Sequence, residues 1–313
     1  MKTVLITGGE GFLGSHLADF LAKRGDRVII IDHHQKEKKR YLPKSVEVHH
    51  MDFSDERVRE ILLETKLDCV FHLAAQISVT KSMAFPLQDA EKNILAPLRF
   101  LGWCKDAKVG KIVFASSGGA IYGDYPVRPT PLVFDVQPLS PYGIGKQAFE
   151  QYLESAGTID RLPWAAMRFS NLYGPRQQVT KPLGEGNVIS LFLDKMLVTG
   201  EPFIVYGDGS ASRDYLFIDD AVDALVRAWE CPFSGVVNVG SEKETSLRTL
   251  LDNLFTIHGS DHSIVYLPGR PGEVAHSVLN ASSAREHLGW NARTDFHEGL
   301  QKTYDWYAAT FAR

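Results

Sequence analysis

The sequence predicts an α/β protein with a doubly wound parallel sheet and a smaller, mixed α/β C-terminal domain. In the first half, short runs rich in β-branched residues alternate with segments that have amphipathic helical spacing. Strands that alternate with helices form βαβ units, and their helices cover both faces of a parallel sheet. The second half is less regular and breaks repeatedly at Gly and Pro. A length of 313 residues suits one large domain or two domains that share a cleft.

The first domain is expected to span residues 1–172, and each of its strands follows from an apolar run. These runs predict strands at 2–7, 27–32, 46–52, 68–75 and 111–116. Helical spacing predicts a helix at 12–25 that ends on Gly25, a capped helix at 54–66, and a long helical stretch between the last two strands. We expect this domain to take back residues of about 214–240.

The smaller domain is expected to comprise mainly residues 173–313. Residues 168–177 begin as a strand and break into a Gly/Pro loop, whereas 180–190 form a loop that leads into a helix. Residues 206–215 form a turn-rich segment. A helix at 219–230 starts with two acidic residues, which suit the positive end of the helix dipole. An amphipathic helix at 295–311 closes the chain.

The composition is that of a soluble globular protein. Hydrophobic residues make up 44% and charged residues 23% of the chain, and the net charge of −4 gives no reason to expect a nucleic acid or an acidic membrane as partner. No apolar stretch approaches the length of a membrane span. The three cysteines are isolated and lack metal-ligand spacing, so we expect reduced thiols, a cytoplasmic protein and no metal site. The basic run at 36–40 is expected to be a solvated loop.

The run TGGEGFLG at residues 7–14 follows the first strand and opens the first helix. Gly8 or Gly9 supplies a tight turn, Gly11 admits a pyrophosphate, and Gly14 lets the helix pack on the strand. Asp32 ends the second strand, where a carboxylate accepts hydrogen bonds from a ribose diol and repels a 2′-phosphate. The cofactor is therefore expected to be NAD rather than NADP. Further cofactor contacts are expected from Phe12, Leu13, Asp52, Phe53, Leu73, Ala74 and Ala75.

Tyr142 and Lys146 have Tyr-x-x-x-Lys spacing, which places both side chains on one face of a helix. A tyrosine with an ordinary pKa of about 10 is a poor base, and lowering that pKa to about 7 requires roughly 4 kcal/mol. A cation about 6 Å away supplies roughly 3 kcal/mol at an effective dielectric constant of about 20. Lys146 together with an oxidised nicotinamide ring is therefore sufficient to make Tyr142 a base.

The whole set of motifs resembles the extended short-chain dehydrogenase/reductase family. The motifs are TGGEGFLG, HLAA at 72–75, SSGGAIYG at 116–123, Tyr142 with Lys146, and RFSNLYGPRQ at 168–177. The chain is most similar to the nucleotide-sugar epimerases typified by UDP-glucose 4-epimerase, over nearly its whole length. The resemblance implies a Rossmann domain that binds NAD and a C-terminal domain that binds a nucleoside-diphosphate sugar, with a UDP-sugar favoured by analogy.

The resemblance also implies roles for individual residues. Tyr142 matches the catalytic base and Lys146 the lysine that binds the ribose. Two arginines, Arg213 and Arg270, match those that clamp the diphosphate, and the fork of a guanidinium suits that role. An alternative for each arginine is a surface ion pair. Further contacts with the nucleotide sugar are expected from Asn171, Asn187, Val188, Tyr206, Glu273 and Ser277.

One position departs from the family pattern. Members carry Ser or Thr four residues before the tyrosine of the YG pair, and its hydroxyl passes a proton between the sugar O4 and the catalytic tyrosine. Counting back from Tyr122 gives Gly118 at that position, with Ser117 one residue earlier. We expect the loop to present Ser117 in the same place, which makes Ser117 a third catalytic residue. The alternative is that Tyr142 acts directly on O4. Gly118 and Gly119 would let the nicotinamide and the sugar approach the backbone.

The same loop bears on the reaction. Related dehydratases and decarboxylases place acids directly after the hydroxyl, whereas this chain has Gly119 and Ala120. The sequence therefore favours C4 epimerisation through a transient 4-keto sugar. The alternatives are a nucleotide-sugar dehydratase or reductase and, more distantly, a non-catalytic NAD-binding sensor.

Two finer expectations also come from the resemblance. Ser277 matches the residue that gates the C2 side of the sugar, and its small size predicts that UDP-GlcNAc and UDP-GalNAc are accepted, with UDP-Glc and UDP-Gal left open. Helices around 87–105 and 145–156 are expected to form a four-helix homodimer interface, unless they serve only ordinary core packing.

Overall fold

The computed structural model describes residues 1–33, 41–179, 187–269 and 274–311. Its main feature is a parallel sheet of seven strands in the order β10-β6-β5-β4-β1-β2-β3. The strands are β1 (Thr3–Thr7), β2 (Arg27–Asp32), β3 (Glu47–His50), β4 (Cys69–His72), β5 (Ile112–Ser117), β6 (Trp164–Phe169) and β10 (Gly235–Val239). All five strands predicted for the first half are present, and β6 and β10 extend the sheet. The α/β fold class with a doubly wound parallel sheet is confirmed.

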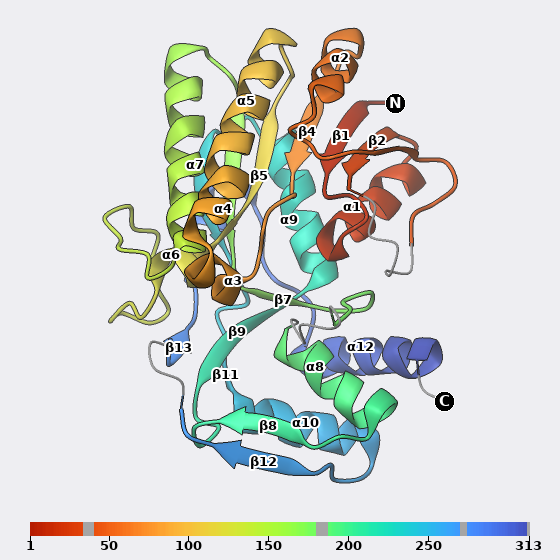
Figure 1. Ribbon diagram of the computed structural model, residues 1–313, viewed down its shortest axis with the longest axis vertical. Coiled ribbons are helices and arrows are strands. Elements are labelled where there is room, and N and C mark those ends of the chain that lie inside the picture. Colours follow the sequence, from red (N-terminus) through yellow and green to blue (C-terminus); the bar gives the residue numbers. More distant parts are fainter. Residues whose placement is uncertain (34–40, 180–186, 270–273, 312–313) are drawn as a thin grey trace.

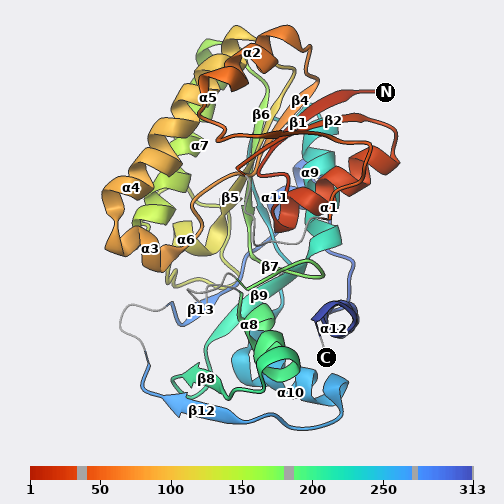
Figure 2. The ribbon, with the colours of Figure 1, turned by 45° about the vertical axis from the view of Figure 1, so that its right-hand side comes forward.

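Helices cover both faces of this sheet, as Figures 1 and 2 show. One face packs against α1 (Phe12–Lys23), α9 (Ile218–Glu230) and α11 (Ser282–Leu288). The other packs against α2 (Glu56–Glu64), α5 (Ala96–Asp106) and α7 (Pro141–Ile159). Helix α1 stops just before Gly25, which has a φ of +88°, a backbone conformation that glycine adopts without strain. Because both faces are covered, the strands are apolar along almost their whole length.

The helical stretch between β4 and β5 is divided into several parts. It consists of α3 (Val79–Ala84), α4 (Pro86–Ala90), the π-helical turn η1 (Glu91–Leu95) and α5. Phe85 has a φ of −134° and a ψ of 63°, because Pro86 disfavours the helical conformation in the residue before it. The predicted long helical stretch is therefore present, and it is interrupted at Phe85 because of Pro86.

The smaller part of the molecule lies below the main sheet in Figure 1. Strand β9 (Ser212–Phe217) pairs with β7 (Asn171–Tyr173), β11 (Glu244–Ser246) and β13 (His276–Ser277), and β8 (Phe203–Tyr206) pairs with β12 (Ile264–Leu267). The helices are α8 (Val188–Asp194), which continues as η2 (Lys195–Thr199), α10 (Leu247–His258) and α12 (Phe296–Phe311). They share a third apolar core. The segment 206–215 was expected only as turns, but strands flank its turn on both sides.

The strand order reverses between β1 and β4, because β2 lies on one side of β1 and β4 on the other. A crevice forms where two neighbouring loops diverge at the carboxyl ends of such strands, and ligands of doubly wound folds bind there. The short helix α6 (Gly118–Tyr122) follows β5 at the same edge of the sheet. Among the described helices, none has both the length and the apolar character that crossing a membrane requires.

Candidate functional site

The turn between β1 and α1 has the geometry of a phosphate-binding turn. Gly8 has a φ of +74°, and its N–H donates to the carbonyl of Ile31 at 2.9 Å. A β-carbon on Gly14 would lie 2.2 Å from the Gly8 carbonyl oxygen, so α1 packs against the turn only with glycine there. On Gly11, the N-terminal cap of α1, a β-carbon would meet the Gly8 oxygen at 3.1 Å and no other described atom within 4 Å outside its own chain neighbours. The outer face of the turn therefore leaves room for a phosphate at the start of a helix.

The carboxylates predicted to contact the cofactor differ in their surroundings. Asp32 ends β2, and its Oδ2 accepts a hydrogen bond from the Glu10 N–H at 2.8 Å, which holds the carboxylate beside the glycine turn. Asp52 follows β3 and accepts from Ser54 and from Lys92, which lies 3.0 Å away. A ribose diol is therefore matched by Asp32, whereas the Asp52 carboxylate is already used within the chain.

The remaining residues predicted at the cofactor site lie around the same turn. Ala74 follows β4, and its N–H lies 2.9 Å from the position of a β-carbon on Gly8. Phe53 is buried and meets the ring of His72 edge-on. Phe12 and Leu13 form the first turn of α1, and Leu73 and Ala75 flank Ala74 after β4. The donors and open space of this turn fit a dinucleotide.

Ser117, Tyr142 and Lys146 come together at the carboxyl end of β5. Ser117 is the last residue of β5, and its side chain lies close enough to the Tyr142 hydroxyl to lower the pKa of that tyrosine. Tyr142 lies in the first turn of α7, which begins at Pro141 after the cap Ser140. One turn later, the Lys146 ammonium lies 5.7 Å from the centre of the Tyr142 ring and donates to the Ala115 carbonyl at 2.8 Å.

The electrostatics of this group are dominated by burial. Burial raises the pKa of Tyr142 to about 12, although part of its surface stays exposed, and the nearby Asp89 carboxylate acts in the same direction. Only the hydrogen bond from Ser117 lowers that pKa. Burial also lowers the pKa of Lys146 to about 7, against the opposing effect of Glu150 and Asp89. The chain alone therefore holds Tyr142 protonated, and a further positive charge is required to make it a base.

Several buried polar residues of the site carry no signal in the sequence motifs. Asp89 accepts hydrogen bonds from the Gln76 and Asn93 side-chain amides, both at 2.8 Å, and the Asn93 Oδ1 accepts from the Gln76 N–H at 2.9 Å. This cluster packs beside α7, since a β-carbon on Gly145 would lie 3.0 Å from Cβ of Asn93. The sequence around them gives little signal, because Gln88, Glu91 and Lys92 are also polar and nothing marks Asp89 and Asn93 as buried.

A second buried network of polar side chains connects α7 with β5, β6 and α6. The Arg168 guanidinium is 1% exposed and forms a two-pronged ion pair with Glu150, the residue one turn after Lys146. Glu150 also accepts from the Ser116 hydroxyl, next to Ser117 on β5. Arg168 donates in addition to the Tyr122 hydroxyl at 2.8 Å, at the end of α6. These contacts fix α7, β5 and α6 relative to one another.

Gly118 and Gly119 begin helix α6 directly after Ser117, where the sequence predicted a loop, because the helix starts at the end of β5. This glycine-rich start of α6, here called the glycine loop, is covered by the segment around β13. A β-carbon on Gly118 would lie 2.6 Å from Cδ1 of Leu279, and one on Gly119 would lie 3.2 Å from Oγ of Ser277. Ser277 is also the register partner of Arg213 on β9. The structure thus brings together the glycine loop, Ser277 and the strand that carries Arg213.

The other residues predicted to bind a nucleotide sugar are placed as follows. Asn171 starts β7 and is the register partner of Tyr215 on β9. Asn187 caps α8, whose first residue is Val188, and its side chain donates to the Leu172 carbonyl at 3.1 Å. Tyr206 ends β8.

Arg213 donates to the carbonyls of Ser212 and Ala275, and within the described part of the chain it forms no ion pair. Arg270, Glu273 and the basic run 36–40 lie outside the described residues.

Comparison with known proteins points to one family. Residues 4–240 match the family described as NAD dependent epimerase/dehydratase. The chain is similar to UDP-glucose 4-epimerase of Mycolicibacterium smegmatis, with 37% identity over 313 residues that cover 98% of each protein.

Solved structures give the same result. The crystal structure of UDP-glucose 4-epimerase from Thermotoga maritima with UDP-glucose has a TM-score of 0.93 and 38% identity, and covers 98% of this chain and 99% of that one. UDP-N-acetylglucosamine 4-epimerase from Methanobrevibacter ruminantium, in complex with UDP-N-acetylmuramic acid, has a TM-score of 0.91 and 33% identity, with 98% of both chains covered.

Proposed function

The chain belongs to the NAD-dependent epimerase/dehydratase family, and from this premise we propose that it is an NAD-dependent UDP-sugar 4-epimerase. The observation that carries the proposal is the grouping of Ser117, Tyr142 and Lys146 at the carboxyl end of β5, where the Lys146 ammonium lies 5.7 Å from the centre of the Tyr142 ring. This group lies at the same edge of the sheet as the glycine turn and Asp32. A proton-transfer group and a dinucleotide turn at one edge are what reversible oxidation of a sugar hydroxyl needs.

Each residue of the group has a distinct task. Tyr142 removes the O4 proton from the sugar, through Ser117 or directly, and later returns it. Lys146 is proposed to bind the ribose, and its ammonium lies 5.7 Å from the centre of the Tyr142 ring. The glycine turn holds the pyrophosphate, and Asp32 accepts hydrogen bonds from the ribose diol. When NAD is bound there, the chemistry it supplies is reversible hydride acceptance from C4.

The pKa values support this division of tasks. Burial raises the pKa of Tyr142 to about 12, so the tyrosine becomes a base only when more positive charge lies beside it. An oxidised nicotinamide brings that charge, whereas a reduced one does not. The residues of the chain thus link proton removal by Tyr142 to the oxidised state of the cofactor.

Binding of the nucleotide part leaves the sugar free to turn. Epimerisation requires that the sugar present both faces of C4, so its anchors have to lie outside the sugar ring. We propose that the diphosphate and the base are held by Arg213, Asn171, Asn187 and Val188. We also propose that the nucleotide sugar is contacted by Arg270, Tyr206 and Glu273. Ser117, Gly118, Gly119 and Ser277 are proposed to line the sugar. Such positioning supplies a large share of the rate enhancement.

The alternatives on the same scaffold find less support. A dehydratase needs an acid directly after Ser117, and α6 instead begins with Gly118 and Gly119, followed by Ala120. Ser277 lies beside Gly119, and the small size of its side chain supports a pocket that accepts an N-acetyl group at C2. We therefore propose that UDP-GlcNAc and UDP-GalNAc are substrates, together with UDP-Glc and UDP-Gal.

The organisation of the molecule follows from the same proposal. We propose an NAD-binding domain of residues 1–172 that takes back residues of about 214–240. Helix α9 packs on the main sheet and β10 joins it, which supports this return, whereas β9 up to Phe217 lies in the small sheet. Residues 173–313 then form mainly the substrate domain. A cytoplasmic location is proposed on the three free cysteines.

A homodimer through α4, η1, α5 and α7 is supported by exposed apolar side chains on these helices. Leu87 is 73% exposed, Leu95 60% and Ile144 50%. Exposed apolar residues gathered on packed helices mark an interaction surface.

Proton NMR of the purified protein with UDP-GlcNAc, and separately with UDP-Glc, tests the proposed function. No NAD is added, because NAD is regenerated in each cycle and is expected to stay bound. A new anomeric signal of the C4 epimer is expected. A stable 4-keto product, net consumption of reduced cofactor, or unchanged spectra with both sugars would overturn the proposal.

A further inference from the structure

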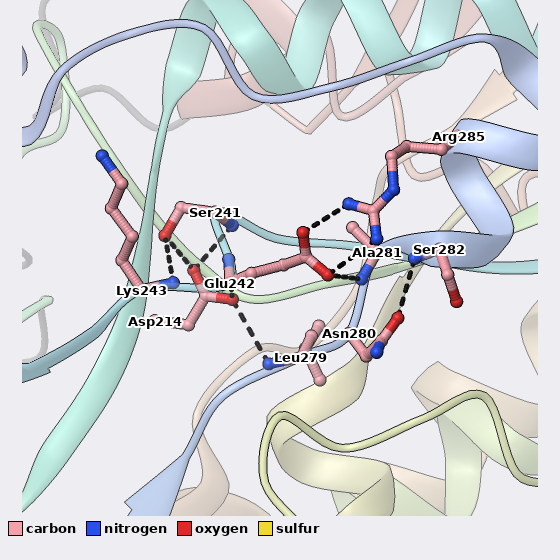
Figure 3. A network of polar contacts seen from close by, with 9 residues as sticks. All are labelled: Asp214, Ser241, Glu242, Lys243, Leu279, Asn280, Ala281, Ser282 and Arg285. Carbon is pink, nitrogen blue, oxygen red and sulfur yellow. Dashed lines mark hydrogen bonds and ion pairs between the residues drawn. The ribbon is translucent and has the colours of Figure 1, made fainter.

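The carboxylate of Asp214 is buried beside the proposed sugar pocket and faces only hydrogen-bond donors. Asp214 follows Arg213 on β9 and is 0% exposed. It accepts from the Ser241 N–H at 2.8 Å and the Ser241 hydroxyl at 2.7 Å, and from the N–H groups of Glu242 and Leu279, each at 3.3 Å. Figure 3 shows these contacts. Burial raises the pKa of Asp214 and the four donors oppose that shift, since only an ionised carboxylate satisfies all of them.

The loop of Ser241 and Glu242, which supplies three of these four donors, is held in an unusual shape. Glu242 has a φ of +61°, which is unfavourable for a residue with a β-carbon by about 1 kcal/mol. Its carboxylate accepts from the Ala281 N–H at 2.9 Å and forms an ion pair with Arg285, as Figure 3 also shows. A β-carbon on Gly240 would lie 2.3 Å from Oδ2 of Asp214, so the loop approaches the carboxylate as closely as glycine allows. These features together direct the loop amides at Asp214.

The third partner of Asp214 is the segment that covers the glycine loop. Thr130 holds residues 278–280 from their other side, by donating to the Val278 carbonyl at 2.7 Å and accepting from the Asn280 N–H at 2.8 Å. Leu279 lies between these supports and packs on Gly118, and Ser277 lies over Gly119. One carboxylate therefore connects the strand of Arg213 with the segment that faces the catalytic loop.

We propose that Asp214 is a positioning residue that sets the spacing between Ser277 and Leu279 on one side and the Ser117–Gly119 loop on the other. Through this spacing it determines which C2 substituent the sugar pocket accepts. The inference rests on the proposed epimerase function and extends it to a residue that does not touch the sugar. The four donors already occupy the Asp214 carboxylate, so it acts through the backbone of the segment that it holds.

Asp214→Asn tests the proposal, because the amide has nearly the same shape but turns an NH₂ group toward N–H donors. The measured quantity is the ratio of kcat/KM for UDP-GlcNAc to kcat/KM for UDP-Glc, in the full-length protein with its retained NAD. We expect this ratio to change by about threefold or more, the scale on which a small change in pocket size acts. The ratio does not depend on the fraction of folded enzyme, so a purely structural role would leave it unchanged.

Two further variants complete the test. Ser241→Ala removes one donor and leaves the carboxylate in place, so it is expected to shift the ratio in the same direction by less and carries the test if Asp214→Asn fails to fold. Asp208→Asn makes the same chemical change at an exposed turn, where the carboxylate accepts from Ser210, and is expected to keep the wild-type ratio. An unchanged ratio in every folded variant at Asp214 and Ser241 overturns the positioning role. Failure of the wild-type protein to convert either sugar instead overturns the proposed function.

Discussion

Leu279 occupies the space that a side chain at position 118 would need. A β-carbon on Gly118 would lie 2.6 Å from Cδ1 and 2.7 Å from Cδ2 of Leu279. Leu279 is 1% exposed and packs in a cluster with Ile121 and Tyr122, so it has little room to move. This packing explains why the position at which the family pattern has a hydroxyl is a glycine here. The hydroxyl that reaches Tyr142 is that of Ser117.

The contact between Gly118 and Leu279 predicts that a larger residue at position 118 is tolerated only when the residue at position 279 is smaller. Gly118→Ala is expected to lower the free energy of unfolding by about 1–3 kcal/mol, because it overpacks a buried contact. In a Leu279→Ala background the same change is expected to be much less destabilising, with a coupling energy of about 0.5–3 kcal/mol. Denaturant unfolding of the four proteins measures this coupling, and additive effects would show that the two residues do not compete for space.

The proposed proton path from the sugar through Ser117 to Tyr142 predicts a graded loss of activity. Removal of a group that transfers a proton lowers kcat by about 10²–10⁴-fold. Tyr142→Phe is therefore expected to lower kcat by at least about 10²-fold. Ser117→Ala is expected to lose less, and Ser117→Thr, which keeps the hydroxyl, is expected to retain more activity than Ser117→Ala. Steady-state kinetics with measured NAD content per chain separates these effects from cofactor loss. Wild-type kcat in Ser117→Ala would mean that Tyr142 acts directly on O4.

The lowered pKa of Lys146 predicts that the free energy of unfolding depends on pH in protein stripped of bound nucleotide. Burial lowers the pKa of Lys146 to about 7, so between that value and its ordinary pKa the unfolded chain binds one more proton than the folded one. Stability is therefore expected to rise with pH between about 7 and 10, by up to about 1.4 kcal/mol per pH unit. Above this window the raised pKa of Tyr142 acts in the opposite direction.

Urea unfolding across this pH window measures the effect. Lys146→Met removes the titrating group and is expected to flatten the slope, whereas Lys66→Met, at an exposed lysine, is expected to leave it unchanged. Equal slopes in Lys146→Met and the wild-type protein would contradict a buried lysine of lowered pKa.

The glycine turn predicts a specific defect in cofactor binding. Gly14→Ala places a β-carbon 2.2 Å from the Gly8 carbonyl oxygen, so it is expected to push α1 away from the turn and abolish NAD retention. Gly102→Ala on α5 is the matched control, since no described atom outside its chain neighbours and the nearby backbone of α5 lies within 4 Å of its β-carbon position. Alanine there is expected to raise stability by up to about 1 kcal/mol. NAD released on denaturation and counted per chain distinguishes the two, and full NAD retention in Gly14→Ala would contradict this account of the turn.

The elements that the sequence predicts well are those with local causes. The spacing of Gly8, Gly11 and Gly14 requires a strand before it and a helix after it, and both are present. Tyr142 and Lys146 share a helix face because they are four residues apart. The long helical stretch after β4 is broken because Pro86 constrains Phe85, and this local signal outweighs the helical periodicity around it.

The contacts that decide the shape of the sugar pocket lie far apart in the sequence. Leu279 reaches Gly118 and Asp214 through pairing that joins distant segments, so no motif around Gly118 shows why it is a glycine. The raised pKa of Tyr142 is likewise a result of burial, which spacing alone does not reveal. The strand β8 ends directly before Gly207, and β9 begins three residues after Gly209, so these glycines gave the segment the sequence pattern of turns.

The most direct test of the central claim is the fate of hydrogen at C4 during turnover in D₂O. If the chain catalyses C4 epimerisation by internal hydride transfer, the epimer formed from unlabelled UDP-sugar carries protium at C4, and substrate deuterated at C4 gives product that keeps its deuterium. Proton NMR and mass spectrometry of the purified product read both results. Solvent deuterium at C4, or at C5, would show proton exchange at carbon and contradict the assignment of Tyr142, Ser117 and Lys146 to a hydride-based epimerisation.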